Sequence, residues 1–246
     1  MSILTAFFAL LYSVAGIVLF GGLAYRIWVF FRTPAPLKIP TTPAPVTRTG
    51  VALRLAREVT VFESLFKSNK WLWLFGWLFH FGLFLVLLRH LRYVIEPVWT
   101  WVVLIQPFGK YASILMVVGL LGLLARRFVV DRVKYISAPS DYLMLLLLIG
   151  IGLSGSLMTF VSTPDIIQLK RFLMGVMIFS WQEFPASPIL VIHMLLVATL
   201  MLIFPFSKLL HAPGVFFSPS RNQVDNPREK RHVVGWALKL ESGDKR

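Results

Sequence analysis

Five long apolar runs constrain this chain more than any other feature of its sequence. They lie at about Ile3–Phe31, Trp71–His90, Phe108–Ala125, Tyr142–Ser162 and Pro188–Leu210. Each run is close to the length of about 20 residues that an α-helix needs to cross the hydrocarbon core of a bilayer. Because a spanning helix satisfies its backbone polar groups internally, the sequence predicts an all-α bundle of five transmembrane helices. The first run is too long for a signal peptide and follows no basic segment, so we expect it to be retained.

The distribution of basic residues predicts how these helices are oriented. The segments after the first, third and fifth runs hold 19 Lys and Arg residues, whereas the opposite side holds five. Those five are Arg89, Arg92, Lys110, Lys170 and Arg171. Because cytoplasmic segments carry the excess of basic residues, we expect the N-terminus outside and the C-terminus in the cytoplasm. The second and fifth helices are then antiparallel.

Composition excludes several classes of function. The net charge is +14, but the charges fall between lipid-embedded runs, which cannot form a nucleic-acid groove. The chain has no cysteine, so disulfides, thiolate iron–sulfur ligands and c-type haem attachment are excluded. Any bound iron must be held chiefly by histidine, and the chain has five histidines.

The apolar runs also suggest a division of the chain. Residues 1–211 are expected to form the membrane domain, with a cytoplasmic loop at 32–70, and residues 212–246 a basic cytoplasmic tail. Within the loop, the proline-rich segment Thr33–Pro45 predicts an extended linker. Residues 50–67 predict either an interfacial helix or a solvated loop helix.

Four histidines lie at membrane depth, two on each of two helices. His80 and His90 are 10 residues apart on the second run, and His193 and His211 are 18 apart on the fifth. Eighteen residues make five helical turns, so His193 and His211 are predicted to share one face, about 27 Å apart. A lone histidine in a span often only forms an interhelical hydrogen bond. Two on each antiparallel helix instead predict two facing pairs.

The predicted pairs are His90 with His193 near the outer surface and His80 with His211 near the inner one. Each pair is typical of an electron-transfer haem, because two axial imidazoles leave no coordination site for oxygen. Helical rise places the two centres about 21 Å apart. Arg89 and Arg92 flank His90 and are candidate partners of haem propionates, with headgroup anchoring as the alternative.

Two stretches resemble a known family. They are LFHFGLFLVLLRH at Leu78–His90 and HMLLVATLMLIFPFSKLLHAPG at His193–Gly214. Both are similar to the gamma, or cytochrome b, subunit of respiratory nitrate reductase. The resemblance covers most of the chain and implies five spans and two b haems, with His80, His90, His193 and His211 as axial ligands.

The tail departs from the nitrate reductase pattern. Its sequence VFFSPSRNQVDNPREKRHVVGW, at Val215–Trp236, looks more like DsrM, the cytochrome b subunit of the DsrMKJOP complexes of sulfur-metabolising prokaryotes. That resemblance implies an iron–sulfur partner similar to heterodisulfide reductase and a quinone, menaquinone or ubiquinone, as redox substrate. It also implies further membrane and periplasmic subunits and a place in the bacterial cytoplasmic membrane.

These observations favour an electron-transfer subunit without a catalytic dyad of its own. Electrons would pass between a quinone near the outer haem and the cytoplasmic partner, with Arg89, Lys110 and Glu96 as candidate quinone-site residues and interfacial anchoring as their alternative. Basic and aromatic residues predict that the tail docks this partner. The alternatives are a nitrate reductase gamma subunit, a cofactor-free membrane anchor, or a transporter. A transporter is disfavoured because the sequence lacks paired repeats of broken helices.

Overall fold

The computed structural model describes residues 1–34, 40, 43–225, 233 and 237. Over this part the chain forms helices and no strands, which confirms the predicted all-α class. The chain divides into a larger unit, Met1–Leu23 with Phe62–Ser207, and a smaller unit, Ala24–Val61 with Lys208–Arg246. The two units are described separately below.

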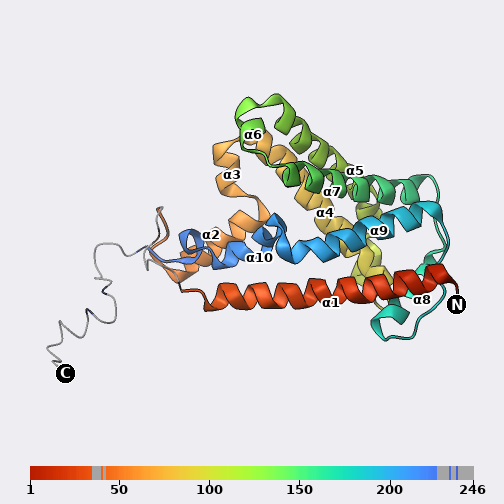
Figure 1. Cartoon of the computed structure of the whole chain (residues 1–246). Helices are drawn as coiled ribbons and strands as arrows, with labels where there is room; N and C mark the ends of the chain where they lie inside the picture. Colours follow the sequence, from red (N-terminus) through yellow and green to blue (C-terminus); the bar gives the residue numbers. More distant parts are fainter. Residues whose placement is uncertain (35–39, 41–42, 226–232, 234–236, 238–246) are drawn as a thin grey trace, which may run out of the picture. The chain divides into compact units, whose positions relative to one another are not determined.

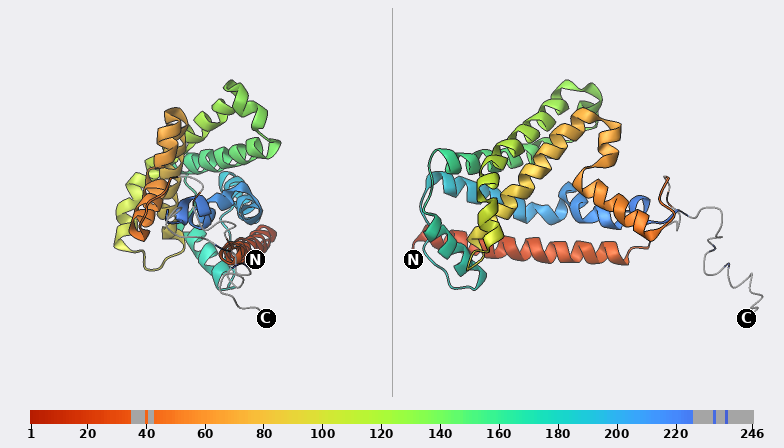
Figure 2. Two further views of the ribbon diagram at one scale, coloured as in Figure 1. Left: turned by 90° about the vertical axis from the view of Figure 1, so that its left-hand side faces the viewer. Right: turned by 180° about the vertical axis from the view of Figure 1, so that it is seen from behind.

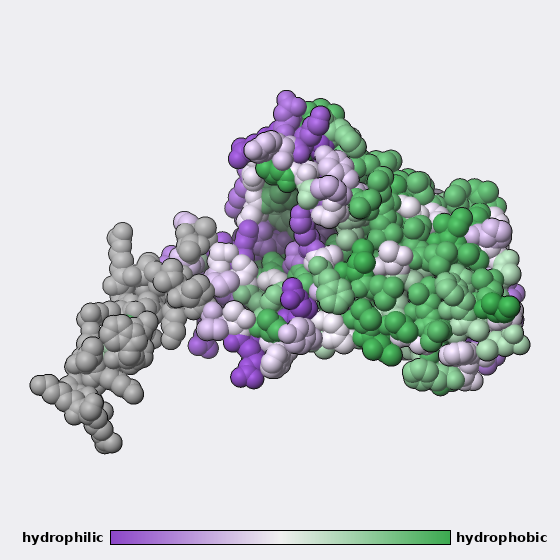
Figure 3. Space-filling model, viewed as in Figure 1, coloured by the Kyte–Doolittle hydropathy of each residue, from purple (hydrophilic) through white to green (hydrophobic). Residues whose placement is uncertain are grey.

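The five predicted spans are confirmed. They are α1 (Ile3–Arg32), α4 (Lys70–His90) with η1 (Leu91–Tyr93), α5 (Thr100–Val129), α7 (Pro139–Phe160), and α9 (Pro188–Ile203) with η2 (Phe204–Phe206) (Figure 1). Between 17% and 33% of the most apolar window of each span is buried within the chain. Most of these side chains therefore face outward, and hydrophobic residues cover the long helices of the larger unit in Figure 3. Such a surface is suited to lipid rather than water.

Glycines bring α4 and α5 close together, and Figure 2 shows the two helices side by side. A Cβ atom on Gly82 would lie 2.7 Å from the backbone of Ala112 and Met116, and one on Gly119 would lie 2.6 Å from the Phe79 nitrogen. Only residues without a side chain permit backbones to approach this closely. Gly82 therefore serves helix packing.

Two apolar clusters form the core of the larger unit. One joins α4, α5 and α7 through Phe79, Met116, Leu120, Leu145, Leu148 and Ile149. The other joins α1, α8 (Ile166–Met177) and α9 through Phe8, Ala9, Leu169, Phe172, Phe184, Leu190 and Met194. α8 lies outside the five predicted spans because its 12 residues are too few to cross a membrane, although its apolar residues recur at helical spacing among polar ones, which is the pattern of an amphipathic helix.

The boundaries of two spans differ from the prediction. α5 begins at Thr100, eight residues early, and continues through Pro107. α9 ends at Ile203, because Pro205 has no backbone N–H to continue the helix, and Ser207 is extended with φ −104° and ψ 173°. The predicted continuous helix over Pro188–Leu210 is therefore wrong. The inferences of a shared face and a 27 Å separation for His193 and His211 assumed an unbroken helix, so they lose their basis.

Short helices occupy the cytoplasmic segments predicted between the spans. Residues 50–67 form the end of α2 (Arg48–Thr60) and most of α3 (Glu63–Ser68), which are separated by Phe62 in the left-handed conformation with φ 51°. α6 (Asp131–Ile136) follows α5. Hydrophilic residues gather where α3 and α6 lie in Figure 3. The side on which these segments lie stays a prediction.

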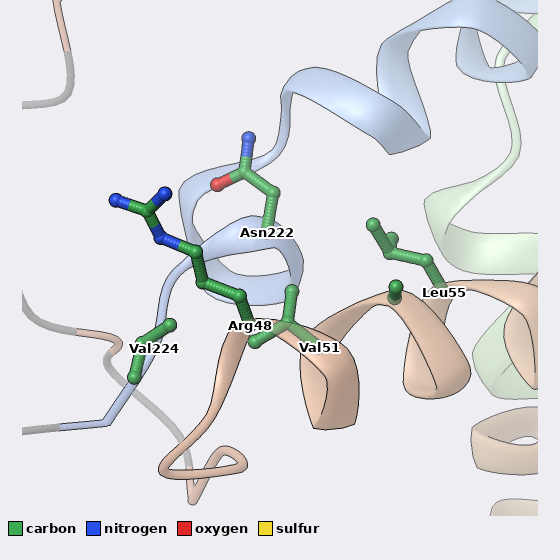
Figure 4. A pocket seen from close by; sticks show the side chains of 6 residues that line it. Arg48, Val51, Leu55, Asn222 and Val224 are labelled. Carbon is green, nitrogen blue, oxygen red and sulfur yellow. The ribbon is translucent and has the colours of Figure 1, made fainter.

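The smaller unit contains α2 and the segment after Ser207. This segment forms η3 (Lys208–Leu210), α10 (His211–Gly214), η4 (Val215–Phe217) and α11 (Pro219–Asn222). An ion pair of 2.7 Å between Arg221 and Glu58 joins α11 to α2. Beside it lies a pocket lined by Arg48, Val51, Ala52, Leu55, Asn222 and Val224 (Figure 4). Most of the predicted docking tail, including Arg228, Lys230, Arg231 and Trp236, lies outside the described residues.

Candidate functional site

His90 and His193 face one another in the larger unit. His90 is the last residue of α4, and His193 lies in the second turn of α9. Their ring centroids are 6.5 Å apart and their planes differ by 18°. Two metal–nitrogen bonds of about 2 Å each would place two such rings about 6 Å apart across one metal ion. The arrangement therefore fits two axial ligands on one iron, as antiparallel helices predicted.

Hydrogen bonds fix the tautomer of both rings. His90 donates from Nδ1 to the Val86 carbonyl at 2.7 Å, and His193 Nδ1 lies 2.9 Å from the Ser154 hydroxyl oxygen. That hydroxyl lies 2.7 Å from the Gly150 carbonyl, to which it donates, so its oxygen accepts from the imidazole. With the proton on Nδ1, each ring carries its lone pair on Nε2. A metal-binding histidine is oriented in the same way.

His80 has the same tautomer in a different environment. It lies mid-way along α4 and donates from Nδ1 to the Gly76 carbonyl at 2.8 Å. Its ring meets the Phe62 ring edge-on at 5.0 Å and lies 4.5 Å from the Phe79 ring. The imidazole is therefore oriented among aromatic side chains and is partly buried.

His211 belongs to the smaller unit and is the first residue of α10. Its Nδ1 donates to the Lys208 carbonyl at 2.9 Å, so the lone pair again lies on Nε2. All four histidines thus present the nitrogen that binds metals. The pairing of His80 with His211 stays a prediction, because the two residues belong to separate units.

The two arginines next to His90 join a polar network with α5 and α7. Arg92 donates to the Gln106 side-chain oxygen at 3.2 Å, and Gln106 donates back to the Arg89 carbonyl at 3.3 Å. Arg89 also reaches the Thr159 hydroxyl at 3.5 Å. Two guanidinium groups are therefore held next to a candidate haem ligand, where they suit a carboxylate partner.

The other two candidate quinone-site residues have separate partners. Glu96 forms an ion pair with Lys170 of α8, and its side chain is exposed. The ammonium group of Lys110 lies 5.3 Å from the centroid of the Phe160 ring, within the range of a cation–π contact. The structure places Arg89, but not these two residues, in the polar network. Their predicted role stays a prediction.

Comparison with known proteins adds a second line of information. Residues 48–225, well over half of the chain, match the nitrate reductase gamma subunit family. This chain belongs to that family. The matched segment contains all four candidate ligand histidines and the polar network next to His90. The resemblance seen in the sequence is confirmed.

Two archaeal relatives of this gamma-subunit family member are both named Hdr-like menaquinol oxidoreductase cytochrome b-like subunit. The protein of Archaeoglobus fulgidus is 35% identical in an alignment 260 positions long that includes 87% of this chain and 78% of the relative. That of Archaeoglobus profundus is 31% identical in an alignment 280 positions long that includes 94% of this chain and 82% of the relative.

Sequence reasoning about this gamma-subunit family member missed three polar residues that the structure brings to the site. Ser154 and Thr159 lie on α7, and Gln106 lies on α5, two residues before the predicted start of that span at Phe108. A polar side chain inside a span is a functional candidate by default, so that signal was available. Their contacts with a particular histidine or arginine depend on packing between distant segments, which the sequence alone does not give.

Proposed function

We propose that this chain is the membrane cytochrome b subunit of a quinol oxidoreductase complex. It would hold two b haems and pass electrons between the quinone pool and a partner subunit on the cytoplasmic side. The observation that carries the proposal is the facing of His90 and His193, with both rings held through Nδ1. The archaeal relatives, which are named menaquinol oxidoreductase cytochrome b-like subunits, support the same function.

Each histidine has a defined part in this proposal. His90 and His193 hold one haem, and His80 and His211 hold the other. When bound, haem supplies a one-electron exchange between ferric and ferrous iron. The backbone carbonyls of Val86, Gly76 and Lys208 and the Ser154 hydroxyl keep the ring nitrogens aligned, and Arg89 and Arg92 neutralise propionates.

The quinone and the partner follow from the two resemblances. Menaquinone is the favoured quinone, because both relatives are named menaquinol oxidoreductase subunits. The same names carry the term Hdr-like, which supports an iron–sulfur partner similar to heterodisulfide reductase. We place the quinone near Arg89, on the outer side of the cytoplasmic membrane, and assign the complex to dissimilatory sulfur metabolism. Since both relatives are archaeal, the bacterial assignment rests on the tail sequence alone.

A second candidate is a gamma subunit of respiratory nitrate reductase. The family match over residues 48–225 favours it. The two candidates share the haems and the quinone and differ in the cytoplasmic partner. Identifying the subunits that purify with the chain from its native membrane distinguishes them, since one predicts an iron–sulfur subunit similar to heterodisulfide reductase and the other a nitrate reductase.

A spectrum and a titration test the shared part of the proposal. The purified chain should give the reduced-minus-oxidised absorption bands of b-type haem, with two haems per polypeptide. Menaquinol should reduce them. A preparation of intact chain without bound haem would contradict the proposal and would favour a cofactor-free anchor or a transporter.

A further inference from the structure

His193 differs from the other candidate ligands in the group that accepts the hydrogen bond from its Nδ1. His80 and His90 each donate to the carbonyl four residues earlier in their own helix, and His211 to the carbonyl three residues earlier. A bond of this kind fixes a ring relative to its own backbone. The acceptor for His193 is instead a side chain of α7, 39 residues away in sequence. The orientation of this ring therefore depends on how two spans pack.

Ser154 is set to act only as an acceptor toward this ring. Its hydroxyl lies 2.7 Å from the Gly150 carbonyl and 3.1 Å from the Ile151 carbonyl, so its single proton is used within α7. Both Ser154 and His193 are buried, with exposed fractions of 6% and 8%. Water therefore has little access to replace either partner, and loss of the hydroxyl leaves the buried N–H with only the Ile151 carbonyl of the same helix, which also interacts with the ring.

The next residue on α7 brings the backbone close to the same imidazole. A Cβ atom on Gly155 would lie 3.4 Å from His193 Cε1 and 3.8 Å from its Nδ1. The ring thus has Ser154 at its Nδ1 and the α7 backbone beside it, while it faces His90. Rotation away from this position would separate Nδ1 from its acceptor.

We propose that Ser154 is a positioning residue that holds the His193 ring toward His90 and sets the electron-donating strength of that ligand. The inference rests on the proposed haem-binding function and deepens it. An acceptor on Nδ1–H makes an imidazole a more basic ligand, and loss of such a partner typically weakens metal binding about 10–100-fold. A less basic ligand stabilises ferric iron less, so the midpoint potential of this haem should rise when the acceptor is lost.

A matched pair of substitutions isolates the hydroxyl from the shape of the side chain. Threonine and valine have the same branched shape, so Ser154→Thr keeps the acceptor and Ser154→Val removes it with the same steric change. Ser113→Ala is the control for loss of a buried hydroxyl, because Ser113 is also 6% exposed and its hydroxyl donates only to the Lys110 carbonyl. All variants are prepared as the full chain. Haem content, redox titration and the electron paramagnetic resonance spectrum of the ferric haems are measured.

The expected result is confined to one haem. Ser154→Val should weaken binding of the His193-ligated haem about 10-fold or more. It should also raise the midpoint potential of that haem and alter its resonance signal, which depends on the angle between the two imidazole planes. The other haem should be unchanged, and Ser154→Thr and Ser113→Ala should resemble the unsubstituted chain.

Two outcomes overturn the inference. If Ser154→Val and Ser154→Thr give the same potentials and signals, the hydroxyl does not position the ligand. If Ser154→Val and Ser113→Ala lose both haems equally, the effect is on folding alone. Failure of the proposed function gives a different result, since the unsubstituted chain would then contain no b-type haem.

Discussion

The midpoint and the last residue of α4 place the same kind of side chain in opposite surroundings. His90 faces a second imidazole and is next to a network of two arginines, a glutamine and a threonine. His80 donates to a carbonyl of its own helix and lies against two phenylalanine rings. The tautomer of the imidazole is therefore common to both positions, while the neighbouring charge differs. If the chain holds the two proposed haems, this difference would set them at different potentials.

The largest expected effect is on haem content, and it comes from removing one histidine of each predicted pair. His193→Ala should abolish the haem at the His90 end and largely spare the other, and His80→Ala should do the reverse, because the predicted sites share no ligand. Haem content and low-temperature spectra measure the outcome. His232→Ala is the control. That residue lies outside the described residues and is not a predicted ligand.

A single substitution that left both haems bound by two histidines would contradict the ligand assignment. Loss of both haems from His80→Ala alone would instead show that the site at His80 is needed for the site at His90 and His193 to form. Either result would break the comparison between the two positions.

Truncation after Pro219 tests whether the tail binds the cytoplasmic subunit close to His211. Every predicted ligand precedes Pro219, so both haems should remain and quinol should still reduce them. The cytoplasmic subunit should no longer purify with the chain, and oxidation of the haems through it should fail. Arg221→Ala is a useful intermediate variant, because it removes the ion pair with Glu58 and keeps the rest of the tail. If the truncated chain still binds the cytoplasmic subunit and passes electrons to it at the normal rate, the tail serves only as a membrane anchor.

Neutralising one arginine should change a potential without removing a haem. A positive charge next to the iron disfavours the ferric state, so Arg89→Gln should lower the midpoint potential of the haem on His90 and His193. A unit charge at about 10 Å contributes about 1–2 kcal/mol at an effective dielectric constant of about 20. Redox titration measures the shift. Arg171→Gln, an exposed change on α8, should shift neither haem, and an equal shift of both haems by Arg89→Gln would refute the local assignment.

The smallest expected effect is on the stability of the fold at low pH, through the contact of Glu183 with the start of the chain. Glu183 accepts hydrogen bonds from the Ser2 nitrogen and the Thr5 hydroxyl, and such bonds from Ser2 and Thr5 lower the pKa of its carboxyl group. The folded state thus favours the ionised carboxylate, which stabilises the fold. This stabilisation is present above the ordinary glutamate pKa and is lost as pH falls through the lowered pKa of Glu183.

Thermal unfolding against pH measures this contribution. Glu183→Gln should reduce stability slightly at neutral pH and flatten its decline below about pH 5. Thr5→Val should act in the same direction, because it removes one of the donors. An unchanged decline in both variants would show that the contact does not stabilise the fold.

The parts of this molecule that the sequence predicts well depend on local pattern. The five spans follow from hydrophobic length, and the facing of His90 with His193 follows from antiparallel helices with one histidine near the end of the first and one near the start of the second. Boundaries were less predictable. The predicted third run begins at Phe108, yet α5 begins at Thr100 and continues through Pro107, whereas Pro205 does end α9. A proline interrupts a helix only where surrounding contacts do not compensate for its missing N–H.

Ser154 illustrates why the rest of the site was not predicted. The sequence shows a serine among glycines and leucines in the fourth run, which is equally compatible with close helix packing. Its role depends on the rotation of α7 and α9 about their axes, which no pattern within either segment determines. α8 differs, because its helical spacing of apolar residues is visible in the sequence, whereas the core partners that Leu169 and Phe172 meet are not.

The separation of His90 and His193 in the chain has a consequence for biosynthesis. About a hundred residues lie between them, and Tyr12 of the first span donates a hydrogen bond of 2.9 Å to the carbonyl of Met194 in the last. A nascent polypeptide therefore cannot complete this pair of rings until α9 has left the ribosome and entered the bilayer. If His90 and His193 hold the proposed haem, its insertion must follow translation of α9. A product that stopped before α9 would carry His90 without its counterpart, which would give quality-control proteases a means to distinguish it from the finished subunit.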